Sequence, residues 1–169
     1  MPWGLAICGE WLRSRLSRLR GKLSGSDAHL QLGRYGENLA CRLLEERGYD
    51  LLCQNYRHQG RRELDIVCRD EGILCFVEVK TRRQGVDRDI LPSEAVDLKK
   101  RRHIISASRQ YLAEIGNPPV IYRYDVVEVY LDRKGGFQQA RHIPAAFSEE
   151  AVERAWRQQR RRGGGSWRI

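Results

Sequence analysis

The sequence lacks any run of about 20 apolar residues, the length that a helix needs to cross a bilayer. Its opening stretch, MPWGLAIC, is too short for the apolar part of a signal peptide. Charged residues follow it, and no A-x-A-like cleavage site is present. We therefore expect neither a membrane-spanning nor a secreted protein, and we predict a cytoplasmic location.

The cysteines lack the spacings that bind zinc. Five are present, with no CxxC pair and no histidine at the usual distance. Their odd number and their places inside apolar segments favour reduced thiols in a protein core over disulfides. No internal repeat of solenoid period is present either. These absences argue against a zinc module, a disulfide scaffold and a repeat protein.

Acidic residues are outnumbered by basic ones. The 169 residues include 31 Lys and Arg against 22 Asp and Glu, which gives a net charge of +9. This balance favours an anionic partner, with nucleic acid ahead of an acidic membrane surface. A hydrophobic fraction of 41% with clear periodicity indicates one globular domain with attachments.

The apolar pattern divides the chain into an extension at 1–30, a main domain at 31–131 and a C-terminal part at 132–169. Within 11–23, leucines at helical spacing alternate with Arg and Lys, which predicts a basic amphipathic helix. A linker is expected at 24–27. The helix suits a membrane surface or nucleic acid, but we expect it to pack weakly or stay disordered, without membrane contact.

The main domain predicts elements in the order α, β, β, β, α, β. The first helix runs from residue 32 to a helix-ending glycine, Gly48. Strands are expected at 51–58, 62–69, 73–81 and 120–131, with a long helix before the last of them, stopped at 116–119. Beyond the domain we expect a short strand at 137–144, a basic helix from Ser148 and a flexible tail.

Charged side chains interrupt the two strands at 62–69 and 73–81. Alternation puts Asp65 on one face with Glu63 and Val67, and Glu78 on one face with Lys80. The opposite face of the first strand then carries Leu64, Ile66 and Cys68. Carboxylates on a segment that otherwise looks buried call for an explanation.

The turn between these strands sets which carboxylates meet. A two-residue turn at 71–72 places Asp65 directly across from Glu78. A turn at 70–71 instead places Glu63 across from Glu78, with Asp65 diagonal on the same face. Both registers bring carboxylates together, whereas a one-residue slip would separate them.

Like charges facing each other on a sheet destabilise it, so they need compensation. Lys80 is one candidate and a hard divalent cation is the other. A metal between Asp65 and Glu78 would polarise a phosphodiester and acidify a water, with Lys80 positioning that water or offsetting charge. The pattern thus indicates phosphodiester hydrolysis, while a solvated face with ordinary charges is the alternative.

A third carboxylate borders the apolar stripe of the first helix. Glu37 sits beside Cys41 and Leu44 on the helical wheel, not in the middle of the polar face. If this helix packs on the sheet, Glu37 would point toward the strand carboxylates. The alternative is an ordinary ion pair with Arg34.

Five motifs in order resemble the YraN-like proteins, a bacterial family: GRYGENLA, RRELDIVCRD, FVEVKTRR, EAVDLKKRRHI and YRYDVVEV. Over residues 31–131 the chain is also similar to a restriction-endonuclease-like (PD-D/E-x-K) domain of the Holliday-junction-resolvase type. The resemblance implies an α/β fold with an α-β-β-β-α-β core, in which helices flank a mixed sheet. It also implies Mg²⁺- or Mn²⁺-dependent nuclease chemistry. The catalytic residues that it implies are Glu37, Asp65, Glu78 and Lys80, with the three acids as metal ligands.

Basic residues near this site are expected to hold phosphates. Two follow the strand at 73–81 and four lie early in the second long helix, namely Arg82, Arg83, Lys99, Lys100, Arg101 and Arg102. Such contacts give salt-dependent affinity with little sequence readout. Solvated positions on a helix face are the alternative for each.

The sequence therefore predicts a metal-dependent DNA endonuclease, with branched or damaged DNA among its candidate substrates and a homodimer as a candidate assembly. The alternative is a nucleic-acid-binding protein with a nuclease-like fold that no longer cuts. The complete set of three acids and one lysine favours the enzyme.

Overall fold

A computed structural model describes residues 25–58, 62–84 and 96–163. The basic helix expected at 11–23 lies outside the described residues. Within them, five strands form one sheet and three helices accompany it. The elements are α2 (Gly25–Glu46), β1 (Asp50–His58), β2 (Arg62–Asp70), β3 (Ile73–Arg83), α3 (Leu98–Glu114), β4 (Ile121–Leu131), β5 (Phe137–Phe147) and α4 (Glu149–Gly163).

The sheet is mixed, as expected. Its strand order is β1-β2-β3-β4-β5, so every strand lies beside its neighbour in sequence. All pairs are antiparallel except β3 with β4, which run parallel because the chain crosses over through α3 between them. The predicted α/β class and core order are confirmed.

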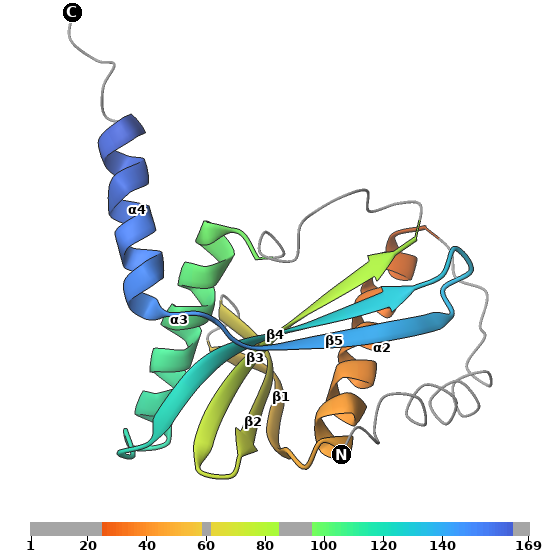
Figure 1. The fold of residues 1–169 in the computed structure, drawn as a ribbon, viewed down its shortest axis with the longest axis horizontal. Helices are drawn as coiled ribbons and strands as arrows, with labels where there is room; N and C mark the ends of the chain where they lie inside the picture. Colours follow the sequence, from red (N-terminus) through yellow and green to blue (C-terminus); the bar gives the residue numbers. More distant parts are fainter. Residues whose placement is uncertain (1–24, 59–61, 85–95, 164–169) are drawn as a thin grey trace, which may run out of the picture.

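The sheet separates two hydrophobic clusters, with α2 and α3 on opposite sides of it (Figure 1). On the α2 side, Leu39 and Leu44 pack with Ile66 of β2. On the α3 side, Ile104 packs with Phe76 of β3. Because both faces are covered, β3 reads as a nearly continuous apolar run in which any charge stands out.

The β2–β3 hairpin turns at 71–72. Asp70 pairs with Ile73, and the ladder continues to Ile66 opposite Val77. Glu71 has a φ of 52°, which suits a tight hairpin turn. The register that places Asp65 toward Glu78 is therefore the one observed.

One expectation about faces was wrong. Leu64 packs in the α3-side cluster, whereas Ile66 and Cys68 pack in the α2-side cluster. The break coincides with a left-handed residue of β1, Asn55 (φ 51°), which lies between the partners of Leu64 and Ile66. Such irregularities bend and twist a strand pair, so strict alternation fails there.

The C-terminal end of α2 lies where the sequence predicted it, whereas its N-terminal end lies earlier in the chain. Gly48, with a φ of 86°, follows the helix, and Tyr49 N donates to Leu44 O at 3.0 Å, as the helix-ending glycine predicts. The helix begins at Gly25, however, so residues 25–27 of the expected linker are helical. Ser26 and Asp27 are residue types that suit the first turn of a helix.

The C-terminal part forms a longer strand than expected. β5 extends to Phe147 and includes Pro144, which an edge strand tolerates because one side of it makes no ladder hydrogen bonds. Ser148 Oγ accepts from Ala151 N at 3.2 Å, so it caps α4. Among the described helices, none is both long and apolar enough to cross a membrane.

Candidate functional site

Asp65 and Glu78 lie where β2 and β3 stop pairing. The ladder ends at Ile66 and Val77, one residue before these carboxylates. Beyond that point, Val79 N donates to Asp65 Oδ2 at 2.8 Å, so a side chain takes the place of a backbone acceptor. This hydrogen bond fixes the Asp65 carboxylate over β3.

Glu78 is buried, with only 2% of its side chain exposed, and it contacts two lysines. Lys80 Nζ donates to Oε1 at 2.8 Å, and Lys100 Nζ lies 3.1 Å from Oε2. Oε2 nevertheless lacks a partner with hydrogen-bond geometry among the described residues. We call Asp65, Glu78, Lys80 and Lys100 the carboxylate site.

Lys100 reaches this site because α3 begins beside it. Asp97 caps the helix, and its carboxylate accepts from Lys100 N at 2.7 Å. The cap fixes the first turn of α3, from which the Lys100 side chain extends to Glu78. The sequence placed Lys100 on a phosphate-binding surface, whereas the structure places its ammonium against a buried carboxylate.

The environment shifts the proton affinities of the site. Burial and the neighbouring Glu78 carboxylate raise the pKa of Asp65 to about 7, although the Val79 amide and Lys100 oppose this. Burial opposes the charged form of Lys100, but the carboxylates of Glu78 and Asp65 raise its pKa above the usual value. The site thus holds a carboxyl group that titrates near neutral pH.

Glu37 approaches the site from α2. The helix comes close to β3 at Gly36, where an added Cβ would lie 1.8 Å from Thr81 Oγ1. Glu37 is half-buried, and its charge makes a small contribution to the raised pKa of Asp65. Within the described residues, no three His, Cys, Asp or Glu side chains are grouped to hold a metal ion. The structure therefore brings together Asp65 and Glu78, with Glu37 near them but outside a ligand group.

Two of the predicted phosphate contacts are used inside the protein. Arg82 is 13% exposed, and its guanidinium lies 3.3 Å from the buried Glu128. Arg101 Nε donates to Val96 O at 2.7 Å while its guanidinium covers the Phe147 ring. Neither guanidinium is presented on an open surface.

The other three predicted phosphate contacts are Arg83, Arg102 and Lys99, and two of them have partners within the protein. Arg83 donates to the carbonyl of Arg133. Arg102 stacks on the Trp156 ring at 4.0 Å. Lys99 is exposed, and among the described residues it has no ion pair. The basic surface predicted around the site is therefore mostly engaged in structural contacts.

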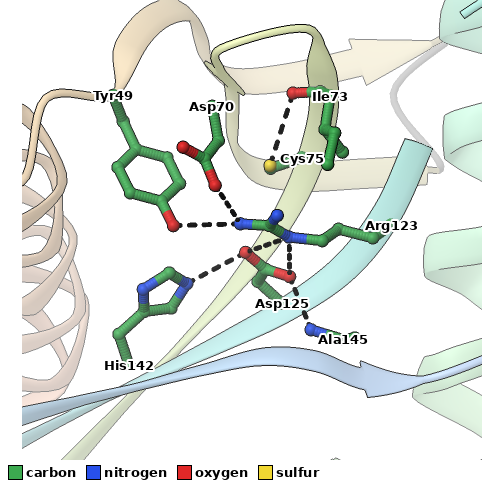
Figure 2. Close-up of polar contacts among 8 residues, drawn as sticks. All are labelled: Tyr49, Asp70, Ile73, Cys75, Arg123, Asp125, His142 and Ala145. Atoms are coloured by element: carbon green, nitrogen blue, oxygen red, sulfur yellow. Dashed lines mark hydrogen bonds and ion pairs between the residues drawn. The ribbon is translucent and has the colours of Figure 1, made fainter. Parts of the chain in front are cut away.

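A second buried polar cluster surrounds Asp125 (Figure 2). Asp125 is fully buried, and Arg123 Nε donates to it at 3.0 Å while Ala145 N donates at 2.8 Å. His142 Nε2 lies 2.9 Å from its other oxygen. Burial opposes ionisation, but the contacts with His142 and Arg123 and the Ala145 amide hold the pKa of Asp125 below its usual range.

Arg123 of β4 connects Asp125 to residues on the β1–β2 side of the sheet. Its Nη2 donates to Tyr49 Oη and to Asp70 Oδ2, both at 2.9 Å (Figure 2). Ala145 has a left-handed φ of 49°, which the bond from its amide to Asp125 helps to hold. The cluster thus joins β2, β4, β5 and the residue that precedes β1, and its satisfied hydrogen bonds indicate a structural role.

Sequence reasoning missed the Asp125 cluster although its signal was present. Arg123 and Asp125 interrupt an apolar β-strand in YRYDVVEV in the same way that Glu78 interrupts β3. The four described cysteines carry no disulfide, and three of them, Cys41, Cys68 and Cys75, are buried, as expected for core thiols.

A mixed α/β sheet with a buried carboxylate–lysine site is the class that the fold and geometry define. The chain belongs to the Uncharacterised protein family UPF0102, whose family model matches residues 36–129. The match begins in α2, ends in β4 and includes every residue of the carboxylate site. It leaves out β5 and α4.

Relatives of the same family cover much of the chain. A UPF0102 protein of Caldicellulosiruptor bescii is 38% identical over 118 residues, 69% of this chain and 97% of the relative. One of Chlorobaculum parvum is 40% identical over 121 residues, 69% of this chain and 91% of the relative. One of Anaeromyxobacter dehalogenans is 37% identical over 130 residues, 77% and 93% of the two chains.

Proposed function

We propose that the protein is a divalent-metal-dependent endonuclease that hydrolyses phosphodiester bonds in DNA, with branched or damaged DNA as candidate substrates. The observation that carries the proposal is the buried Glu78 beside a second carboxylate, Asp65, with Lys100 at 3.1 Å as the ion-pair partner of its Oε2. The similarity of the motifs to the PD-D/E-x-K pattern supports the same chemistry.

The chemistry of the donors fits Mg²⁺ or Mn²⁺. Asp65 and Glu78 offer hard carboxylate oxygens, and Mg²⁺ needs only one or two carboxylates when waters and phosphate oxygens complete its shell. Burial and, after it, the neighbouring Glu78 carboxylate raise the pKa of Asp65, and a bound cation would favour its charged form. A bound metal would supply a Lewis acid and an acidified water.

Lysine and carboxylate side chains of the site would compensate charge on the phosphate and contact the substrate. Lys80, held by Glu78 at 2.8 Å, is placed to offset charge on a phosphate. Lys100 would release Oε2 to the metal and offer its ammonium to the substrate. Glu37 would act from outside the pair by adding negative charge.

The proposal is tested by cleavage of labelled linear, flapped and four-way DNA with Mg²⁺ or Mn²⁺. We expect cutting by the native protein and loss of at least about 100-fold in Asp65→Asn and Glu78→Gln. Glu63→Gln is the matched control, because Glu63 is exposed and pairs with Arg57 at the surface. Cutting that survives in both site variants, or no cutting by the native protein, would contradict the proposal.

A second candidate is a nucleic-acid-binding protein that no longer cuts. The observation that favours it is the double pairing of Glu78 with Lys80 and Lys100, which compensates the carboxylate without a metal. Titration with Mn²⁺ separates the two candidates. Binding that is lost in Glu78→Gln supports the enzyme, and absence of binding supports the inert protein.

A further inference from the structure

Within the part of the chain that the structure describes, four exposed arginines gather on α4. Arg154, Arg157, Arg160 and Arg161 are all exposed, and none of them has an ion pair within the described part of the chain. This contrasts with Arg82, Arg101 and Lys100, which are engaged internally. The surface that is open to an anionic partner therefore differs from the one that sequence reasoning expected.

The first half of α4 is fixed to α3. Val152 is buried in the α3-side cluster, and Trp156 stacks under the Arg102 guanidinium at 4.0 Å. Arg109 pairs with Glu149 at 2.5 Å. Glu149 in the first turn of α4 is thus paired with α3, whereas the exposed arginines described beyond it have no ion pair.

These contacts also set the direction of α4. Along α4 they run from Glu149 to Trp156, and along α3 they run back from Arg109 to Arg102, so the two helices are antiparallel. The outer end of α4 therefore continues past the first turn of α3, the turn that carries Lys100. Figure 1 shows α4 extending beyond that end of α3.

Three arginines form one stripe along this helix. Arg154, Arg157 and Arg161 follow i, i+3 and i+7 spacing, which places them on one face. They line a groove of about 580 Å³ together with Arg109, Gln158 and three carboxylates, those of Glu149, Glu150 and Glu153. Favourable charges at a helix C-terminus account for the last turn only, and Arg154 and Arg157 lie before it. We call Arg154, Arg157 and Arg161 the α4 stripe.

We propose that the α4 stripe binds the phosphate backbone of the nucleic acid whose strand enters the carboxylate site. The inference rests on the proposed function for the identity of the partner. The stripe spans about 10 Å, a length of duplex that carries about six phosphate charges. Its arginines would position the duplex without reading its sequence.

The experiment measures binding of a fluorescent 20-base-pair duplex in EDTA, so that no cutting occurs. The variant Arg154→Gln, Arg157→Gln, Arg161→Gln should bind at least tenfold more weakly at 100 mM salt. The slope of log affinity against log salt should fall by about 3, because each lost phosphate contact removes about 0.9.

The control removes the same charge elsewhere. Arg47, Arg133 and Lys134 are exposed and lie away from α4, and their triple change to Gln should cost less than threefold in affinity. Equal losses in both triple variants, or an unchanged α4 variant, would overturn the inference. So would stripe-dependent binding to phosphatidylserine vesicles without binding to the duplex.

The inference and the proposed function can fail separately. A native protein that cuts DNA, with an α4 variant that binds like the native, rejects the stripe alone. A native protein that binds duplex through the stripe but cuts no substrate supports the stripe and rejects the nuclease. A circular dichroism spectrum and Tm equal to the native values confirm that the exposed changes leave the fold intact.

Discussion

Lys100 lies in the crossover helix α3 and Glu78 in strand β3, and Lys100 Nζ is 3.1 Å from Glu78 Oε2. The oxygen that faces this ammonium is the one that lacks a hydrogen bond. If the proposed metal binds, it would therefore compete with the Lys100 ammonium for Glu78 Oε2.

Replacing Lys100 should strengthen metal binding. Lys100→Met removes the charge that competes at Oε2, and a gain of about 1.4 kcal/mol would raise Mn²⁺ affinity about tenfold. Isothermal titration without DNA measures this. Lys99→Met is the matched control, because Lys99 is exposed on the same turn of α3. Equal affinities in the two variants would contradict the competition.

Replacing Asp65 should stabilise the metal-free protein, and more so at higher pH. The pKa of Asp65 is raised to about 7 in the folded state, against about 3.9 in an unfolded chain. The folded state therefore binds the extra proton, and this group costs stability as pH rises from about 4 to 7. In EDTA, Asp65→Asn should increase Tm at pH 8 more than at pH 5. An equal increase at both pH values, or a decrease, would contradict a raised pKa of Asp65 in the folded protein.

Asp125 should contribute to stability far more than a surface acid. Asp125→Ala removes the carboxylate that pairs with His142 and one of the two carboxylates that pair with Arg123, and we expect a loss of about 3–5 kcal/mol in urea unfolding at pH 7. Asp50→Ala, which breaks an exposed pair with Arg69, should cost less than about 1 kcal/mol. Comparable costs would show that the cluster is not a structural unit.

The same carboxylate gives an acid dependence. Its pKa is lowered in the folded state, so its contribution is present above the unfolded value of about 3.9 and is lost as pH falls below it. The difference in unfolding free energy between native and Asp125→Asn proteins should therefore shrink below about pH 4. A constant difference down to pH 2.5 would contradict the assignment.

The contact between α2 and β3 should not tolerate a side chain at Gly36. Gly36→Ala would place Cβ 1.8 Å from Thr81 Oγ1, and we expect a loss of about 1–3 kcal/mol. Gly33→Ala is the control, because it meets nothing within 4 Å and should stabilise the helix by about 0.5–1 kcal/mol. Thr81→Ala should restore part of the loss in a double variant.

The sequence predicted those parts of the site that depend on local rules. The turn at 71–72 and strand alternation brought Asp65 toward Glu78, and both follow from residues within one hairpin. The contact of Lys100 with Glu78 cannot be predicted from local rules, because it depends on where the crossover helix α3 packs against the sheet. Arg82 was misplaced for the same reason, since its partner Glu128 comes from the neighbouring parallel strand.

The parallel pairing of β3 and β4 determines the order in which the site can assemble. The β2–β3 hairpin makes only local contacts and can close early, whereas α3 and β4 add contacts that are distant in sequence and close late. Lys100 can then reach Glu78 only after most of the core has formed. During synthesis the carboxylates would therefore be in place with Lys80 before Lys100 arrives, so the proposed metal would meet Oε2 of Glu78 without its competitor in the nascent hairpin.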